Sequence, residues 1–326
     1  MHYRFVISRY VALGLALSAL AATLWTEASG QDPTRPNQDA TYRLVHSRTG
    51  KELTLAQLAD ELATRDVIFF GELHDNVTGH QVYARLARLL AARRDDLVIS
   101  MEMFERDVQG VLNDYLRGKI DEALFLQHSR PWKDYARDYK PLIELARERK
   151  LDVIAGNLPR PVAGKVASKE GSLSPYLPRN TTAPLDRYWE LFADVMKGHP
   201  GADGVVERMY RAQCAKDDAM AEGIADYLAM NPHRQPLIIH CNGNFHSDYG
   251  LGTAARLQQR TPLLQTAIIS MVAVPDVAKA DVTADRKKAH YLLVVPAPPK
   301  PPPAATKPSP TQPTKPQPTK ATTPAQ

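Results

Sequence analysis

The chain has 326 residues, of which 44% are hydrophobic and 24% are charged, enough for a sizeable hydrophobic core. Its formal net charge of +5 comes from the two ends: residues 1–30 carry +1 and residues 296–326 carry +4. Basic and acidic side chains therefore balance between residues 31 and 295. This balance excludes a basic face for nucleic acid, and we expect no nucleic-acid partner.

Residues 1–30 have the pattern of a signal peptide, which we expect to be removed before Gln31. Arg4 and Arg9 precede an apolar stretch over residues 11–24, and the small residues 28–30 follow it. An uncleaved anchor is the alternative, but the stretch is shorter than the ~20 residues that a spanning helix needs. Because no cysteine follows the stretch directly, we expect an exported protein of the periplasm or cell envelope that is not a lipoprotein.

The rest of the chain divides into an N-terminal segment over residues 31–60, one domain over residues 61–295, and a tail over residues 296–326. The tail is rich in Pro, Thr, Lys and Ala, which bury little apolar surface, so we expect it to be disordered. Cys214 and Cys241 can pair in an oxidising compartment. Two separate buried thiols are favoured, because one cysteine falls in a predicted helix and the other beside a predicted core strand.

Within the domain, apolar runs alternate with helical patterns, which predicts an α/β fold with a mostly parallel central sheet flanked by helices. The predicted strands are residues 67–70, 97–101, 151–155, 237–239, 265–270 and 290–295. The predicted helices are residues 76–94, 107–117, 122–128, 134–149, 185–196, 204–230 and 249–260, with a Gly-, Ser- and Pro-rich loop over residues 164–184.

Polar side chains follow the predicted strands, among them two Gly-x-x-His sequences at residues 71–74 and 243–246. Ligands bind outside the carboxyl ends of parallel strands, so we expect Glu72, His74, Glu102 and His246 to share one crevice as candidate catalytic residues. His74 or Glu72 can act as a general base. Imidazole and carboxylate also suit Zn, Mn or Fe, which makes His74, His246 and Glu102 candidate metal ligands. The alternative is that these side chains only stabilise the sheet.

The domain also resembles the ChaN-like haem-binding uptake proteins of the Tiki, TraB and erythromycin-esterase superfamily, over roughly residues 60–270. The resemblance rests on residues 71–76 with His80 and Gln81, residues 101–106 with Gln109, Trp132 with Tyr135, Tyr139 and Pro141, residues 157–160, Gln213 with Asp217, residues 220–221, and residues 243–246. Several matches in the same order are more specific than either Gly-x-x-His alone.

The resemblance implies a Tiki/ChaN-like fold and an exported protein of haem and iron uptake. In that family haem lies at a dimer interface with tyrosine as the iron ligand, and histidine and lysine side chains meet the propionates. A phenolate is an established ligand of haem iron, so Tyr135, Tyr139, Tyr176 and Tyr249 are candidate cofactor-binding residues. The partners implied are haem, a second copy of the chain, and an outer-membrane haem receptor.

Other branches of the superfamily resemble metal-dependent peptidases or esterases that use the same Gly-x-x-His and glutamate positions. In this chain those positions are Glu72, His74, Glu102 and His246. The alternative function is therefore a hydrolase that uses a divalent metal such as Mn, Co or Zn. Such an enzyme needs its polar groups within hydrogen-bond reach of one reacting atom, whereas a haem carrier needs an apolar slot and one accessible tyrosine.

Overall fold

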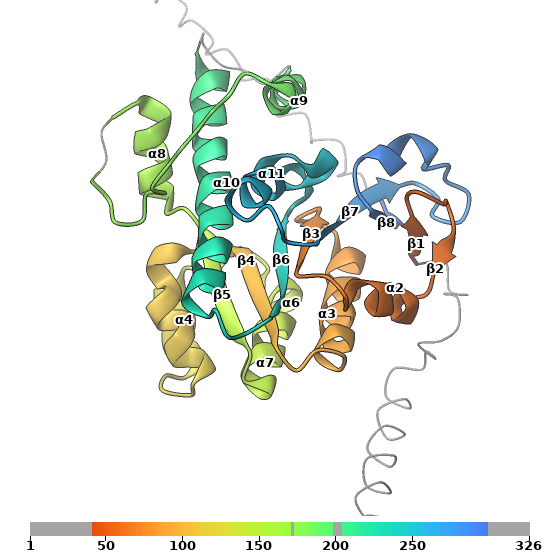
Figure 1. Cartoon of the computed structure of the whole chain (residues 1–326), viewed down its shortest axis with the longest axis horizontal. Helices are drawn as coiled ribbons and strands as arrows, with labels where there is room; N and C mark the ends of the chain where they lie inside the picture. Colours follow the sequence, from red (N-terminus) through yellow and green to blue (C-terminus); the bar gives the residue numbers. More distant parts are fainter. Residues whose placement is uncertain (1–40, 171–172, 198–203, 299–326) are drawn as a thin grey trace, which may run out of the picture.

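The computed structural model describes residues 41–170, 173–197 and 204–298. The expected signal peptide and residues 299–326 of the expected tail lie outside these ranges, whereas Pro296 belongs to the last strand. Eight strands form one sheet in the order β2-β1-β8-β7-β3-β6-β4-β5 (Figure 1). The strands from β8 to β5 are parallel, and only β1 runs antiparallel to its neighbours β2 and β8. The strand bounds are β1 Arg43–His46, β2 Glu52–Leu53, β3 Val67–Glu72, β4 Leu97–Glu105, β5 Asp152–Asn157, β6 Leu237–Gly243, β7 Thr266–Val274 and β8 Tyr291–Pro296.

Helices cover both faces of this sheet, which confirms the predicted α/β class (Figure 1). One face packs against α2 to α7, and the other against α10 and α11. Successive residues of β3 alternate between the layers, as a buried parallel strand must: Ile68 and Phe70 meet the first, Val67 and Phe69 the second. The helix bounds are α2 Leu55–Leu62, α3 Val77–Ala91, α4 Gln109–Leu116, α5 Glu122–Ser129, α6 Tyr135–Asp138, α7 Lys140–Arg149, α8 Arg160–Ser168, α9 Arg187–Met196, α10 Val205–Met230 and α11 Gly252–Arg260.

The structure adds elements that the sequence patterns did not predict. Strands β1 and β2 and helix α2 lie within residues 41–62, and α8 takes up the first part of the segment that we expected to be a loop. The helix predicted over residues 134–149 is divided into α6 and α7, because Pro141 lies in the first turn of α7 and cannot continue a helix from before it. Cys214 and Cys241 are buried free thiols. Within the described ranges, no helix is long and apolar enough to cross a membrane.

A close approach of two backbones fixes the end of β3. A Cβ atom on Gly71 would lie 2.9 Å from Cα of Asn244 and 3.1 Å from the carbonyl oxygen of Ile269. Both neighbours are backbone atoms of adjoining segments, so neither can move as a flexible side chain would. Only glycine therefore lets the residues after β3 and β6 lie this close together.

We expect Gly71→Ala to lower the free energy of unfolding by about 1–3 kcal/mol, the usual cost of overpacking a rigid site. Urea denaturation of the two proteins measures this difference. Gly110→Ala, in α4, is the matched control, because a Cβ there meets no atom within 4 Å. Alanine is also the better helix former, so the control should lose no stability. Equal stability of Gly71→Ala and the parent protein would contradict the packing argument.

Candidate functional site

The candidate site lies at the carboxyl ends of three neighbouring parallel strands. Glu72 is the last residue of β3, Glu102 lies within β4, and β6 between them ends at Gly243. His74 follows β3 directly, and His246 lies in the short 3-10 helix η2 (Asn244–His246) after β6. The structure thus brings together the four side chains that sequence reasoning assigned to one crevice.

Glu72 is the centre of the first half of the site and is 1% exposed. Its Oε1 accepts a hydrogen bond of 2.7 Å from the Tyr139 hydroxyl and lies 2.8 Å from Nδ1 of His74. Its Oε2 accepts from the Cys241 thiol at 3.1 Å and lies 3.4 Å from Nδ1 of His80. These contacts fix the carboxylate in place and orient the ring of His74.

His74 is the accessible member of the site, since its side chain is 48% exposed. Its ring packs edge-on against Trp132 with centroids 5.0 Å apart. A Cβ on Gly243 would lie 2.9 Å from Cε1 and Nε2 of His74, so only glycine leaves room for the ring. Partial burial lowers the pKa of His74, but its hydrogen bond to Glu72 and the charge of Glu102 outweigh that effect and raise it.

His246 forms the second half of the site and lies between two carboxylates. Its Nδ1 is 2.7 Å from Oδ1 of Asp217 in α10, and its Nε2 is 3.3 Å from Oε1 of Glu102. Burial opposes the charge on the ring, yet the two carboxylates raise the pKa of His246 to about 10. The positive charge of His246 in turn lowers the pKa of the buried Glu102 despite desolvation. The charge of His74 and the hydrogen bond from the Gly243 N–H at 2.8 Å lower it further.

Asp217 has a role that the sequence did not reveal. It is fully buried, and besides His246 it accepts hydrogen bonds of 2.8 Å from the hydroxyls of Tyr188 and Thr253. These three partners come from three different helices, η2, α9 and α11, and contact both oxygens of the carboxylate. The resemblance included this residue without a function, and its position in the middle of a helix gave no other signal.

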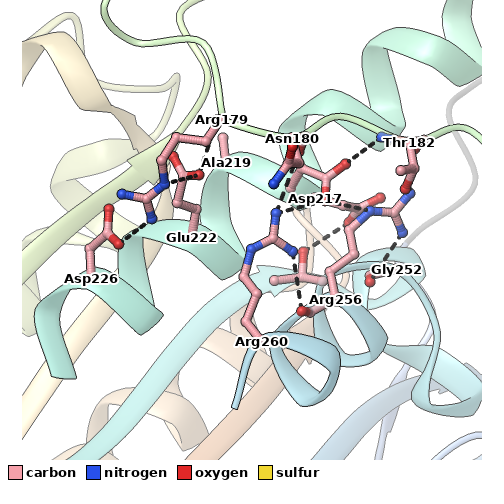
Figure 2. Close-up of polar contacts among 12 residues, drawn as sticks. Arg179, Asn180, Thr182, Asp217, Ala219, Glu222, Asp226, Gly252, Arg256 and Arg260 are labelled. Atoms are coloured by element: carbon pink, nitrogen blue, oxygen red, sulfur yellow. Dashed lines mark hydrogen bonds and ion pairs between the residues drawn. The ribbon is translucent and has the colours of Figure 1, made fainter. Parts of the chain in front are cut away.

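A network of arginines fastens the segment before α9 to the helices behind the site (Figure 2). Arg256 donates to the Thr182 carbonyl oxygen at 3.0 Å, and Asp218 accepts from the Thr182 N–H at 3.0 Å. Arg260 donates to the same carboxylate of Asp218 at 3.0 Å. These bonds join the segment to both α10 and α11, and so they hold Tyr188 in α9 over Asp217.

The same segment is held at a second point nearer the carboxyl end of α10 (Figure 2). Glu222 accepts from the Arg179 N–H at 3.0 Å and pairs with Arg106 at 3.2 Å, while Asp226 accepts from the guanidinium of Arg179. The Arg106 guanidinium also donates to the carbonyl oxygen of Tyr176 at 3.3 Å. Tyr176 is thus presented from a tethered part of the chain.

The four candidate tyrosines fall into two groups. Tyr135 and Tyr139 are 5% and 1% exposed, and burial raises the pKa of both hydroxyls, for Tyr139 with a further contribution from Glu72. Neither is placed to offer a phenolate to a bound group. Tyr176 is 37% exposed, and Tyr249 is partly exposed in the turn that follows His246.

Tyr249 has an unusual backbone conformation, with φ 62° and ψ 14°. This left-handed region is disfavoured for a residue with a side chain, and such strain is retained where the surroundings hold the residue in place. Its N–H donates to the Lys288 carbonyl oxygen at 2.6 Å, and its side chain is within electrostatic reach of Arg187 and Lys288. This backbone hydrogen bond joins the turn after His246 to the segment that precedes β8.

The three candidate metal ligands do not form a metal site. In residues 41–170, 173–197 and 204–298, no group of three or more His, Cys, Asp or Glu side chains has an arrangement that could hold a metal ion. His246 directs both ring nitrogens at carboxylates, and an imidazolium has no lone pair to give to a metal. The arrangement suits proton transfer, with His74 as the group open to solvent.

The fold and site together define an α/β protein with a mostly parallel sheet and a cluster of charged side chains at the carboxyl ends of its strands. The chain belongs to the haem-binding uptake family of the Tiki superfamily, ChaN, whose members it matches over residues 58–257. This match confirms the resemblance seen in the sequence. No curated protein matches the chain.

Solved structures are similar to this chain in fold at low sequence identity. The structure of ChaN of Campylobacter jejuni with cofacially bound haem is 17% identical, with a TM-score of 0.62 over 81% of this chain and 100% of that one. The erythromycin esterase EreC is 15% identical with a TM-score of 0.44, over 72% of this chain and 77% of that one. The toxin effector domain RRSP from Vibrio vulnificus is 16% identical with a TM-score of 0.39, over 66% of this chain and 36% of that one.

We expect Asp217→Asn to lower the pKa of His246 by about one pH unit or more, because it removes one of the two carboxylates that hold the cation. Because the pKa of His246 is raised on folding, its protonated ring stabilises the fold fully at a pH below the unfolded-state pKa near ~6.5. This stabilisation is lost as the pH rises toward 10. Titration of the imidazole signals by NMR measures the change.

Asp218→Asn is the control for the adjacent position, because Asp218 pairs with arginines rather than with His246. It should leave the pKa of His246 unaltered. If His246 of the parent protein titrates near ~6.5, the value of a free histidine, the buried ion pair does not exist.

Proposed function

We propose that this protein is exported and binds haem for haem and iron uptake. Its family membership supports haem binding, and the solved structure of ChaN of Campylobacter jejuni carries haem. The signal-peptide pattern over residues 1–30 supports export to the periplasm or cell envelope. An outer-membrane haem receptor is the partner that such a location would offer.

The observation that carries the proposal is the position of Tyr249. Its phenol is partly exposed, its backbone is left-handed, and its N–H donates to the Lys288 carbonyl oxygen at 2.6 Å. A phenolate ligates haem iron. Lys288, whose backbone contacts Tyr249 and whose side chain pairs with Asp285 at 2.7 Å, is a cation of the kind that suits a propionate.

The surroundings of Tyr249 also offer the apolar surface that a macrocycle requires. Phe245 and Leu251 flank it in sequence and are partly buried against the aromatic cluster of α9 and α10. Leu185 and Val195, before and within α9, are 76% and 60% exposed. Exposed apolar side chains are typical of a face that a second surface covers. We therefore propose that two copies of the chain enclose haem at this face.

We expect the mature protein, beginning near Gln31, to bind haem with a saturable shift of the Soret band, and Tyr249→Phe to change the position of that band. Removal of the phenolate takes away the axial ligand, whereas the ring and its packing remain. Tyr139→Phe is the matched control, because Tyr139 is buried against Glu72 and is not accessible to haem. Its Soret band should coincide with that of the parent protein.

Two other results of this titration have a defined meaning. A change with Tyr176→Phe and none with Tyr249→Phe would assign the ligand to the tethered segment before α9. An unchanged spectrum in both variants would contradict a tyrosine-ligated haem. The intact mass of protein taken from its native envelope tests export in the same preparation, since retention of residues 1–30 would contradict cleavage before Gln31.

A hydrolase is the second candidate function, and the arrangement of His74 favours it. Its ring is held by Glu72 at 2.8 Å, is open to solvent, and lies beside Glu102. An oriented, accessible imidazole next to a second carboxylate is what general acid–base catalysis requires.

Under this second function, His74→Ala should reduce hydrolysis of ester or peptide substrates by about 10²–10⁴-fold, the usual contribution of a general base. The same variant should leave the Soret band of the haem complex unaltered. Absence of any hydrolysis by the parent protein, with and without added Mn, Co or Zn, would rule out this candidate.

A further inference from the structure

A cavity of about 470 Å³ lies at the other end of the sheet from the candidate site. Its lining includes Ala267 and Tyr291, which begin β7 and β8. Ala267 pairs with Ile68 near the start of β3, whereas Glu72 ends that strand. The cavity is therefore separate from the crevice that contains the histidine and glutamate cluster.

Five of the nine residues that line this cavity are basic, and Ser47 and Tyr291 are its other polar residues. Arg48, Arg65 and Arg286 contribute to it, together with His46 and His290, and the lining contains no carboxylate. In the part of the chain that the structure describes, none of the three arginines forms an ion pair, and Nε of Arg65 is buried without a hydrogen-bond partner. Arg65 and Arg286 are partly buried and Arg48 is exposed, so an anion can reach all three guanidinium groups and pair the free donor of Arg65.

The two histidines add hydrogen-bond donors to this lining. Nδ1 of His46 accepts from the Arg48 N–H at 3.2 Å, and Nδ1 of His290 accepts from the Ile268 N–H at 3.0 Å. In the neutral ring the proton must then be on Nε2, which makes each imidazole a donor. Burial lowers the pKa of His290, and the charges of Arg65 and His46 lower it further, as expected in a region of positive potential.

Arg286, another residue of the cavity lining, is held in a fixed position. Its guanidinium donates to the carbonyl oxygens of Ser47 and Arg48, the second at 2.8 Å. Its remaining terminal nitrogen has no hydrogen-bond partner among the described residues. Because its position is fixed before any ligand arrives, little side-chain entropy would be lost on binding.

We propose that this cavity binds a small organic anion that presents two or more carboxylate or phosphate oxygens. Guanidinium groups bind such oxygens in pairs, and the two imidazole donors supply further contacts. The volume is within the range of about 300–1,000 Å³ that small-molecule sites occupy. The edge-on rings of His46 and Tyr291, 5.2 Å apart, provide a wall for the carbon part of the molecule.

The test is calorimetric titration of the full chain with citrate and, separately, with inorganic phosphate. We expect saturable binding of at least one probe with a stoichiometry of one. The double variant Arg48→Gln with Arg65→Gln should weaken it tenfold or more. Arg149→Gln is the matched control, because Arg149 is an exposed arginine at the end of α7 and no part of the cavity lining. It removes the same type of charge, and binding should be unaltered.

The choice of probe and variants makes each outcome decisive. Binding of citrate alone or of phosphate alone, with the expected loss in the double variant, supports the proposal and selects the carboxylate or the phosphate ligand. No saturable binding of either probe, or equal weakening in Arg149→Gln, overturns it. Arg48→Gln alone tests the same site without touching a buried group, since Arg48 is exposed. Haem binding should be the same in all variants, which separates this site from the proposed function.

Discussion

The rest of the candidate site depends on one buried ion pair network, the cation of His246 between Asp217 and Glu102. Charges removed from water are costly unless they are paired and hydrogen-bonded. Here the partners come from α10 and β4, and the Gly243 N–H of β6 completes the shell of Glu102. The pairing therefore joins the α10 layer to two strands of the sheet, and neither layer can shift without exposing an unpaired charge.

Glu72 performs a similar function on the opposite face of the sheet. Its partners Tyr139 and His80 belong to the helices of the first layer, where Ile68 and Phe70 of β3 also point. Glu72 thus connects the sheet to the first helix layer, and Glu102 connects it through His246 to the α10 layer. Gly71 and Gly243 at the strand ends let the two halves of the site approach each other. His74 bridges them, because Glu72 holds its ring and Glu102 contributes to its charge.

Sequence patterns predicted the six parallel strands and the convergence of two histidines, because both follow from hydrophobic runs and from the geometry of parallel sheets. They could not reveal Asp217, whose role arises only when a helix more than twenty residues away packs on the sheet. Nor could they separate buried from accessible tyrosines, because Tyr139 is buried by its bond to Glu72 rather than by its local pattern. The two-residue strand β2 was too short to give a periodic signal.

The functional groups differ in whether their polar atoms are already paired within the protein. Glu102, Asp217 and His246 are paired with one another in the interior, where they join the helix layer to the sheet. His74 and Tyr249 are the members that remain open to solvent. His74 follows directly on β3, whereas Tyr249 lies six residues beyond the end of β6. A rigid interior network with two accessible groups at its rim allows a fold to change its ligand by altering the rim alone.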